Sequence, residues 1–156
     1  MDGQASVGRP RWLIRPLVAF AGGGAREAAS MAQVLIVDDQ VNSARMLSAA
    51  LAMLGHQPIE AYHGQQALEI ISHDGPDLIL LDYMMPGMNG LETLEQIRRL
   101  PDANDIPVYF LTAAQDPYLE ERALRAGASG LLTKPISMKT LESVLPNGSN
   151  GSAKAS

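Results

Sequence analysis

The sequence predicts an α/β fold: a doubly wound, five-stranded parallel sheet with helices on both faces. Between about residues 32 and 146, short apolar runs, often β-branched, alternate with longer amphipathic stretches. The apolar runs are continuous, without the polar alternation that is typical of a half-exposed antiparallel strand. Five strand-helix units fit into about 115 residues, and parallel neighbours joined by helices require right-handed crossovers.

The strands are predicted from the apolar runs in chain order. The third run, Leu-Ile-Leu-Leu, is the most apolar and ends at Asp82, whereas the second run is the weakest. Because every run is short and bounded by turn residues, each fits a strand of ordinary length. The strands are expected over residues 34–37, 58–62, 78–81, 107–111 and 130–133.

The helices are predicted from apolar residues that recur on one face. In the first helix, Ala44, Leu47, Leu51 and Leu54 share a face. Glycines that favour helix ends stand at positions 55 and 127, and Ser137 can cap the last helix, which Pro146 terminates. The helices are expected over residues 42–54, 64–73, 90–100, 117–126 and from 137 to about 145.

Length and composition restrict the class of protein. With 156 residues, the chain has room for one domain of ordinary size. Its 46% hydrophobic and 19% charged residues are typical of a globular chain that buries a core, and no apolar run approaches the length of a membrane span. The absence of cysteine excludes a disulfide scaffold and a thiolate metal site, and it fits the reducing cytoplasm, where we expect the protein.

Charge and composition separate the two ends from the middle. Residues 32–146 contain seven basic and fifteen acidic residues, which leaves no basic stripe for a phosphate backbone, so we expect no direct contact with nucleic acid. Residues 1–31 have no sustained period and are expected to form a flexible extension; Met31 is an alternative start. The Gly/Ser/Asn-rich residues 147–156 are expected to be a disordered tail.

Polar side chains stand where four of the predicted strands end. They are Asp38, Asp39, Asp82, Thr112 and Lys134. Ligands of a parallel doubly wound sheet bind beyond the carboxyl ends of the strands, so these side chains are expected to meet there. Three carboxylates would repel one another without a cation, and their hard oxygens suit Mg²⁺. The hydroxyl and the ammonium suit the oxygens of a phosphoryl group beside that metal.

These residues and their surroundings resemble the receiver domain of two-component response regulators, which has a flavodoxin-like (βα)5 fold. The resemblance covers about residues 32–146 in the family's order and spacing. It rests on Val-Asp-Asp at 37–39, Leu-Leu-Asp-Tyr-Met-Met-Pro-Gly-Met-Asn-Gly at 80–90, Phe-Leu-Thr-Ala at 110–113, Ala-Gly-Ala-Ser-Gly at 126–130 and Leu-Thr-Lys-Pro-Ile at 132–136.

The resemblance implies a role for each residue of the set. Asp82 would be the phosphoacceptor. It would share Mg²⁺ with Asp39 and the backbone carbonyl of Met84, while Asp38 would act mainly through water. Lys134 would pair with one phosphoryl oxygen and Thr112 would move to donate to another. The bond from Lys134 to Pro135 resembles one that is cis in the family.

The resemblance further implies a signalling switch without turnover of an external substrate. A sensor histidine kinase or a histidine phosphotransfer protein would supply the phosphoryl group, and an unidentified downstream protein would bind the switched surface. The tail is too short for a DNA-binding module, so we expect a stand-alone regulator or a phosphorelay intermediate. It would be a monomer or a weak dimer and would not associate with membranes.

Three positions depart from the family pattern. Leu131 replaces the Tyr or Phe that many members have three residues before the Lys, so a different element would couple the site to the output surface. The last helix is shorter than usual, which makes dimerisation through that face less expected. Met84 and Ala114 stand two residues after Asp82 and Thr112, where neither can orient a water by hydrogen bonding, and we therefore predict a long-lived phosphorylated state.

Two other functions would use part of the same residue set or the same fold. A phosphohydrolase of the haloacid dehalogenase type also uses Asp, Mg²⁺, Thr and Lys, but it needs a second Asp where this chain has Met84. A flavodoxin-like electron carrier needs Ser/Thr donors in the first loop, which here begins with Asp39. Turnover of p-nitrophenyl phosphate or a yellow purified protein would support one or the other. The three histidines lack metal-ligand spacing and are expected to be solvated.

Overall fold

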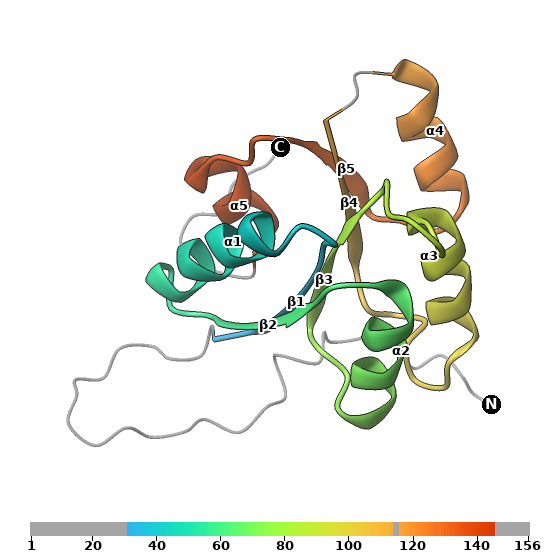
Figure 1. Ribbon diagram of the computed structural model, residues 1–156, viewed down its shortest axis with the longest axis horizontal. Coiled ribbons are helices and arrows are strands. Elements are labelled where there is room, and N and C mark those ends of the chain that lie inside the picture. Colours follow the sequence, from blue (N-terminus) through green and yellow to red (C-terminus); the bar gives the residue numbers. More distant parts are fainter. Residues whose placement is uncertain (1–30, 114–115, 146–156) are drawn as a thin grey trace.

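A computed structural model describes residues 31–113 and 116–145, and these residues form a five-stranded parallel sheet with helices on both faces (Figure 1). The order of the strands is β2-β1-β3-β4-β5, and all four neighbouring pairs are parallel. This confirms the predicted fold class. The elements are β1 Gln33–Val37, α1 Val41–Met53, β2 Gln57–Ala61, α2 Gly64–His73, β3 Leu78–Asp82, α3 Gly90–Arg99, β4 Val108–Thr112, α4 Pro117–Arg125, β5 Gly130–Thr133 and α5 Met138–Val144.

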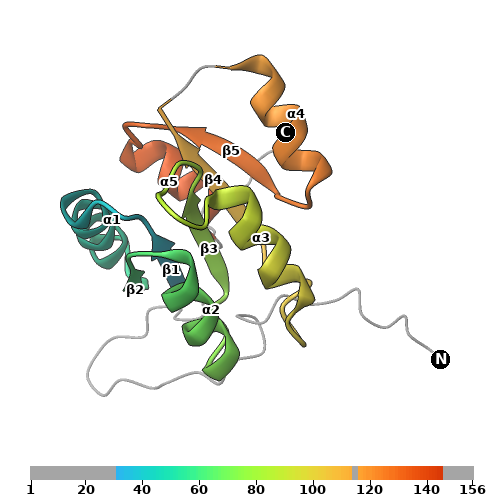
Figure 2. The ribbon, with the colours of Figure 1, turned by 45° about the vertical axis from the view of Figure 1, so that its right-hand side comes forward.

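Two layers of helices enclose the sheet (Figure 2). α2, α3 and α4 cover one face with Ala67, Ile97 and Ala123 among their buried residues. α1 and α5 cover the other face, where Leu47 and Leu141 are buried. Successive strand residues point to opposite faces, so a strand that is covered on both sides must be apolar throughout. This arrangement explains the continuous apolar runs of the sequence.

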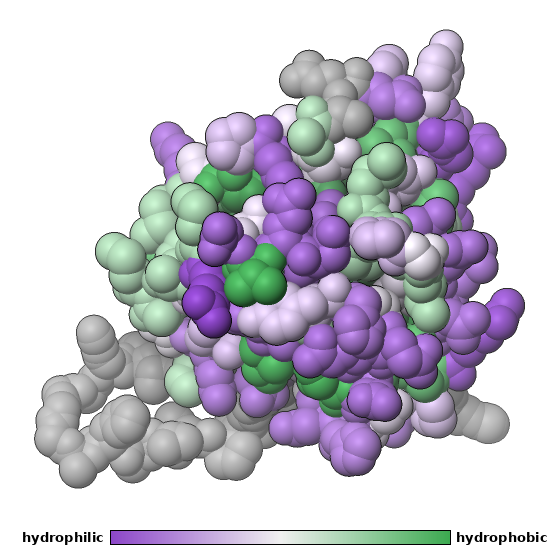
Figure 3. Space-filling model, in the orientation of Figure 1, coloured by the Kyte–Doolittle hydropathy of each residue, from purple (hydrophilic) through white to green (hydrophobic). Residues whose placement is uncertain are grey.

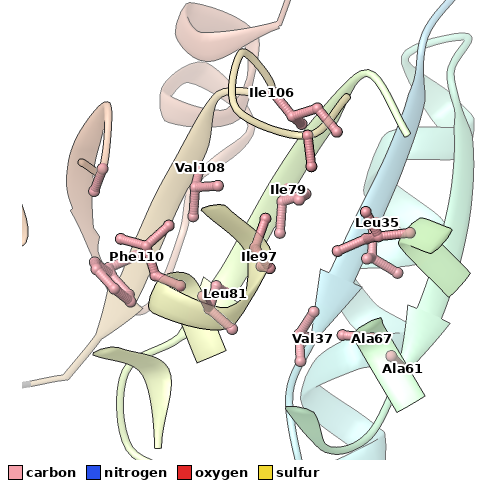
Figure 4. Close-up of a cluster of buried hydrophobic side chains, with 14 of the residues drawn as sticks. Leu35, Val37, Ala61, Ala67, Ile79, Leu81, Ile97, Ile106, Val108 and Phe110 are labelled. Carbon is pink, nitrogen blue, oxygen red and sulfur yellow. The ribbon is translucent and has the colours of Figure 1, made fainter. Parts of the chain in front are cut away.

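The larger core lies under α2, α3 and α4 (Figure 4). Phe110 in this cluster has no exposed surface, and its ring meets that of Tyr83 edge to face, with 5.5 Å between the ring centroids. Ile79 and Leu81 on β3 fill the middle of this cluster and are also fully buried. Removing a side chain of this kind leaves a cavity and costs about 2–5 kcal/mol.

The predicted element bounds agree with the structure to within a residue or two. β4 extends to Thr112, which pairs with Thr133, and it starts at Val108 because Pro107 has no N–H to donate. Ser137 accepts a hydrogen bond from the backbone of Thr140, as predicted, and Gly55 ends the first helix region with φ of 91°. The expectations for residues 1–30, for Ala114 and for residues 146–156 lie outside the described residues.

Several helix ends depend on contacts that the sequence reading did not find. α3 begins with a capping box, in which Asn89 and Glu92 exchange side chain-to-backbone hydrogen bonds. Asp116 caps α4 by accepting from the backbone N–H of Tyr118 at 2.9 Å. Arg98 donates to the carbonyls of three loop residues, Ala103, Ile106 and Gly127, each at 2.9 Å, which connects the end of α3 to the end of α4.

The end of the sheet where β1 starts is closed by buried polar contacts. Nδ1 of His56 accepts a hydrogen bond from the backbone N–H of Ala32 at 3.0 Å, and Asp77 Oδ2 accepts from that of Gln33 at 2.8 Å. His56 is therefore buried, at 7% exposure, and the expectation that it is solvated was wrong. The other two histidines are exposed.

Within the described part of the chain, no helix is both long enough and apolar enough to cross a membrane.

Candidate functional site

The strands β1, β3, β4 and β5 end at the same edge of the sheet (Figure 1), and the five residues singled out above end or follow these strands. Asp38 follows β1, Asp82 is the last residue of β3 and Lys134 follows β5. Because the strands are parallel and in register, their carboxyl ends share this edge. Asp82 pairs with Leu111, so Thr112 stands one residue further along the neighbouring strand.

Three carboxylates form a compact cluster. Each of Asp38, Asp39 and Asp82 offers an oxygen, and these oxygens all lie within 4.8 Å of one another. Asp38 has no exposed surface and Asp82 only 6%, whereas Asp39 is partly exposed. Carboxylates so close in a buried site repel one another, and Coulomb repulsion is strong where water is excluded. The cluster therefore favours a compensating positive charge.

Lys134 supplies one such charge. Its Nζ lies 3.2 Å from Asp38 Oδ2 and 3.6 Å from Asp82 Oδ2. Its backbone N–H donates to the carbonyl of Thr112 at 2.8 Å, and this contact fixes the start of the loop after β5. The peptide bond from Lys134 to Pro135 is cis, as the resemblance implied.

The backbone orients Asp38 from both sides. Its own N–H donates to the carbonyl of Ala61 at the end of β2 at 3.0 Å. Its Oδ1 accepts from the backbone N–H of Gln40 at 2.9 Å, which leaves Oδ2 to meet Lys134. A buried carboxylate with both oxygens engaged is held in one orientation. Asp38 is thus a carboxylate of the cluster whose orientation is fixed.

The pKa of Asp82 is higher than that of an ordinary aspartate. Burial raises its pKa to about 6, and the nearby charge of Asp38 acts in the same direction. The ammonium of Lys134 and the hydrogen bond from the backbone N–H of Met84, at 3.4 Å, act in the opposite direction without cancelling the rise. A carboxyl group with a shifted pKa beside a cation and two other carboxylates is a marker of a functional site.

The loop after β3 brings backbone close to Asp82. The N–H of Tyr83 donates to the carbonyl of Leu111 at 2.9 Å, and that of Gly90 donates to the carbonyl of Tyr83 at 3.0 Å. A Cβ atom at Gly90 would stand 2.7 Å from the carbonyl oxygen of Asp82, so only glycine allows α3 to begin this close to the strand end. Met84, in the same loop, is 68% exposed.

Thr112 is buried at 2% exposure beside the cluster. Asp38, Asp39, Asp82 and Lys134 are thus brought together, Thr112 ends the adjacent strand, and Met84 follows Asp82 in the loop. Sequence reasoning found this set, because each polar residue directly ends or follows an apolar run. It did not single out Gly90, whose signal was only its place at the end of a glycine-containing loop.

Residues 34–145 match the family model of the response regulator receiver domain. The chain belongs to the response regulator receiver family. The phosphate regulon transcriptional regulatory protein PhoB of Pseudomonas aeruginosa is 40% identical over 108 residues, which are 69% of this chain and 47% of the relative. PhoB of Escherichia coli is 37% identical over 109 residues, which are 70% of this chain and 48% of the relative.

Solved receiver structures have the same fold. The chemotaxis protein CheY4 of Vibrio cholerae superposes with a TM-score of 0.69 at 32% identity, covering 72% of this chain and 94% of CheY4. A putative response regulator from Chloroflexus aurantiacus gives a TM-score of 0.68 at 31% identity, covering 72% and 92% of the two chains. This chain spans about half the length of the PhoB relatives, so the similarity concerns their receiver part.

The acidic cluster of this receiver fits the divalent cation that the family generally binds. The donor set consists of three carboxylates within mutual reach, which is the hard-oxygen chemistry that Mg²⁺ prefers. Burial, aided by the nearby charge of Asp38, raises the pKa of Asp82 although Lys134 acts against the rise, and a bound cation would stabilise the ionised form of this carboxylate. Receivers are signalling domains and not conventional enzymes, so the cluster belongs to a switch.

Proposed function

We propose that this receiver accepts a phosphoryl group on Asp82 in a two-component or phosphorelay pathway and thereby switches a surface that binds another protein. One observation supports this above all: Asp82 is a buried carboxylate with a pKa of about 6, held between Asp38, Asp39 and the ammonium of Lys134. At neutral pH the group is mostly ionised, as a nucleophile must be, although its surroundings oppose the charge.

The proposed reaction is a transfer from phosphohistidine. A carboxylate oxygen of Asp82 forms a bond to phosphorus while the bond from phosphorus to the donor imidazole nitrogen breaks, and the imidazole keeps the electron pair of that bond. A sensor histidine kinase or a histidine phosphotransfer protein is the donor that we propose. The product is a mixed anhydride that water hydrolyses back to Asp82 and phosphate.

The metal ligands of the proposal are Asp39, Asp82 and the carbonyl oxygen of Met84, with Asp38 acting through water. When bound, Mg²⁺ would balance the charge that the carboxylates and the phosphoryl oxygens share. Asp38 keeps its orientation through Gln40 and keeps Lys134 beside Asp82, at 3.2 Å and 3.6 Å from the two carboxylates. Asp38 therefore positions Lys134, the cation that the chain itself supplies to the site.

Lys134 and Thr112 would receive the phosphoryl oxygens. The phosphoryl group adds negative charge and acceptors, so Lys134 can exchange part of its contact with Asp82 for a charge-assisted hydrogen bond to the new group. Thr112 would donate its hydroxyl from the end of β4. Since α4 follows β4 in the chain, a shift at Thr112 would alter the surface of α4, β5 and α5, which we propose binds the downstream partner.

The receiver domain itself is proposed to span residues 32–146. Two contacts support its amino-terminal limit, because Ala32 and Gln33 are held by buried acceptors on His56 and Asp77. A cytoplasmic location is part of the proposal, since phosphohistidine donors of this kind act there. A stand-alone mode of action, through protein contact and not through DNA, is proposed from the acidic charge of residues 32–146.

The test is the intact mass of the full chain after incubation with Mg²⁺ and acetyl phosphate or phosphoramidate. We expect the wild type to gain the mass of one phosphoryl group and Asp82→Asn to gain none. Asp74→Asn is the matched control, because Asp74 is an exposed carboxylate at the far end of α2 and should leave the gain unchanged. EDTA should abolish the gain.

Failure has a defined meaning. If circular dichroism shows a folded wild type that gains no mass with either donor, the chain is a degenerate receiver that binds partners constitutively. If Asp82→Asn is still phosphorylated, the acceptor is misassigned. Either result would overturn the proposal.

A further inference from the structure

Residues 83–89, between β3 and α3, form a loop that is called the site loop below. It carries Met84, whose carbonyl oxygen is one of the proposed metal ligands, and it has no helix or strand of its own. The loop reaches the surface, where Met84 is 68% exposed and the space-filling view is pale green (Figure 3). Because a metal ligand must be held within about 0.5 Å of its productive position, contacts from neighbouring elements have to fix the course of this loop.

The end of the site loop is fixed on α3. The carbonyl oxygen of Asn89 accepts two hydrogen bonds from Thr93, one from its backbone N–H at 2.9 Å and one from its Oγ1 at 2.8 Å. Thr93 has no exposed surface. A threonine side chain is branched at Cβ and has few rotamers in a helix, and the hydrogen bond to Asn89 selects one of them. The side chain of Thr93 therefore cannot turn away without losing a buried hydrogen bond.

Helix α2 begins against this end of the site loop. Gly64, the first residue of α2, is buried, and a Cβ atom on it would stand 2.6 Å from Thr93 Oγ1 and 2.9 Å from Met88 Sδ. Both distances are shorter than those that real Cβ atoms make. α2 is itself held in place, because Ala67 and Ile71 are buried in the larger core. The contact therefore leaves no room for a side chain at residue 64.

The backbone of Gly64 does not by itself require glycine. The described glycines with a positive φ are Gly55, Gly87 and Gly127, and Gly64 is not among them. Alanine is the best helix former and glycine a poor one, so alanine would be the better residue at this position if space allowed it. The close approach to Thr93 and Met88 is thus the physical reason for glycine here.

We propose that Gly64 and Thr93 are positioning residues, whose contact holds the site loop so that the carbonyl oxygen of Met84 can bind Mg²⁺. This positioning role rests on the metal site of the proposed function. Neither residue is among the proposed ligands, and both act through the course of the loop. Groups that orient a metal ligand without touching the metal commonly change its affinity about tenfold or more.

The site loop is the part that yields to a side chain at residue 64. Thr93 is held by its hydrogen bond in the first turn of α3, and α3 is held by its other buried residues. Met88 is only partly buried, and the residues on either side of it are exposed, so the loop can move outward more easily than either helix. Such a movement would displace Met84, whose backbone N–H donates to Asp82 Oδ1 at 3.4 Å.

Amide NMR of the full chain during titration with MgCl₂ alone measures the Mg²⁺ affinity and shows whether each variant is folded. We expect Gly64→Ala to weaken Mg²⁺ binding about tenfold. Gly55→Ala is the matched control, because Gly55 has a φ of 91° and lies before β2, at the end of the sheet opposite the site. It should strain the backbone and lower stability, but leave the Mg²⁺ affinity unchanged. A Gly64→Ala variant that binds Mg²⁺ as the wild type does would overturn the proposal.

A double variant separates positioning from a general loss of stability. Thr93→Ala removes the oxygen that the new Cβ atom would meet at 2.6 Å, while the backbone N–H of residue 93 still donates to Asn89. The sulfur of Met88 lies at the end of a flexible side chain and can move aside. The double variant of Gly64→Ala and Thr93→Ala should therefore bind Mg²⁺ more tightly than Gly64→Ala alone. If the two substitutions instead add and the double variant binds most weakly, the contact does not position the loop.

The titration also separates this role from the proposed function. A wild type that binds no Mg²⁺ would overturn the metal site and the positioning role with it, whereas equal binding by the wild type and Gly64→Ala would overturn the positioning role alone. If Gly64→Ala does not fold, Met88→Ala tests the same contact from the side of the loop. Removing the side chain that lies against Gly64 should weaken Mg²⁺ binding several-fold, and an unchanged affinity would overturn the proposal.

Discussion

The two ends of the sheet accommodate their buried polar groups in opposite ways. At the end where β1 starts, Asp77 and His56 each accept a hydrogen bond from a backbone N–H, so their polarity holds the chain together. At the other end, Asp38 and Asp82 are buried beside each other and share Lys134. The first end is arranged for stability. The second stores electrostatic repulsion that a cation or a phosphoryl group can rearrange, which a switch requires.

The largest expected effect is at the closed end. Asp77→Ala should lower the free energy of unfolding by about 2–3 kcal/mol, because the partly buried N–H of Gln33 loses its carboxylate acceptor at 2.8 Å. Urea denaturation at pH 7 measures the change. Asp74→Ala, three residues earlier and exposed, is the control and should stay within about 0.5 kcal/mol of the wild type. Equal effects of the two substitutions would show that the closed end is not held by Asp77.

At the site end, removing a carboxylate should raise the free energy of unfolding instead of lowering it. The pKa of Asp82 rises from 3.8 to about 6 on folding, so the native state holds this proton more tightly and the free energy of unfolding falls as pH rises through that window. Above pH 6 Asp82 is ionised in both the folded and the unfolded state, and the folded state carries the full cost of burying that charge. Asp82→Asn should therefore stabilise the protein by about 1–2 kcal/mol at pH 7 without Mg²⁺, at 1.36 kcal/mol per pKa unit and allowing for relaxation.

The pH dependence makes that prediction specific. Urea denaturation in EDTA should show the gain from Asp82→Asn at pH 7 and its disappearance as pH falls well below the ordinary pKa of 3.8, where the carboxyl group is protonated in both states. Saturating Mg²⁺ should stabilise the wild type more than Asp82→Asn. A destabilised Asp82→Asn at pH 7 would show that the cluster is not under electrostatic strain.

The sequence predicted the site end of the sheet but not the closed end, because only the site residues directly end or follow the apolar runs. The site end was predictable, because Asp82 ends an apolar run and the parallel topology places strand ends together. The closed end was not, since no motif or apolar run around His56 indicates that its side chain accepts a hydrogen bond from the backbone of Ala32. The Asn89 capping box could have been found from Asn89 and Glu92 alone, whereas the three carbonyls that Arg98 contacts require the fold.

His56 at the closed end should give a smaller effect with the opposite pH dependence. Burial lowers the pKa of His56, so the unfolded chain takes up this proton first, and stability is lost as pH falls below the ordinary value of 6.5. His56→Asn keeps a short side chain with an acceptor and removes the titration. Its free energy of unfolding should change less than that of the wild type between pH 7 and pH 5, and thermal melts over that range measure the difference. Equal slopes would exclude His56 as the titrating group.

The smallest expected effect concerns the lifetime of the phosphorylated state. Met84 follows Asp82 by two residues and is 68% exposed, so its side chain can cover the phosphoryl group but cannot orient water by hydrogen bonding. Met84→Asn supplies an amide that can orient an attacking water, and we expect it to shorten the half-life of the phosphorylated chain several-fold, whereas Met84→Leu should leave it unchanged. Intact-mass measurements at intervals after removal of acetyl phosphate give the half-lives. Both exchanges keep the backbone N–H that donates to Asp82 Oδ1, so a lifetime shortened equally by Asn and Leu would assign the effect to shielding by the methionine side chain and not to water orientation.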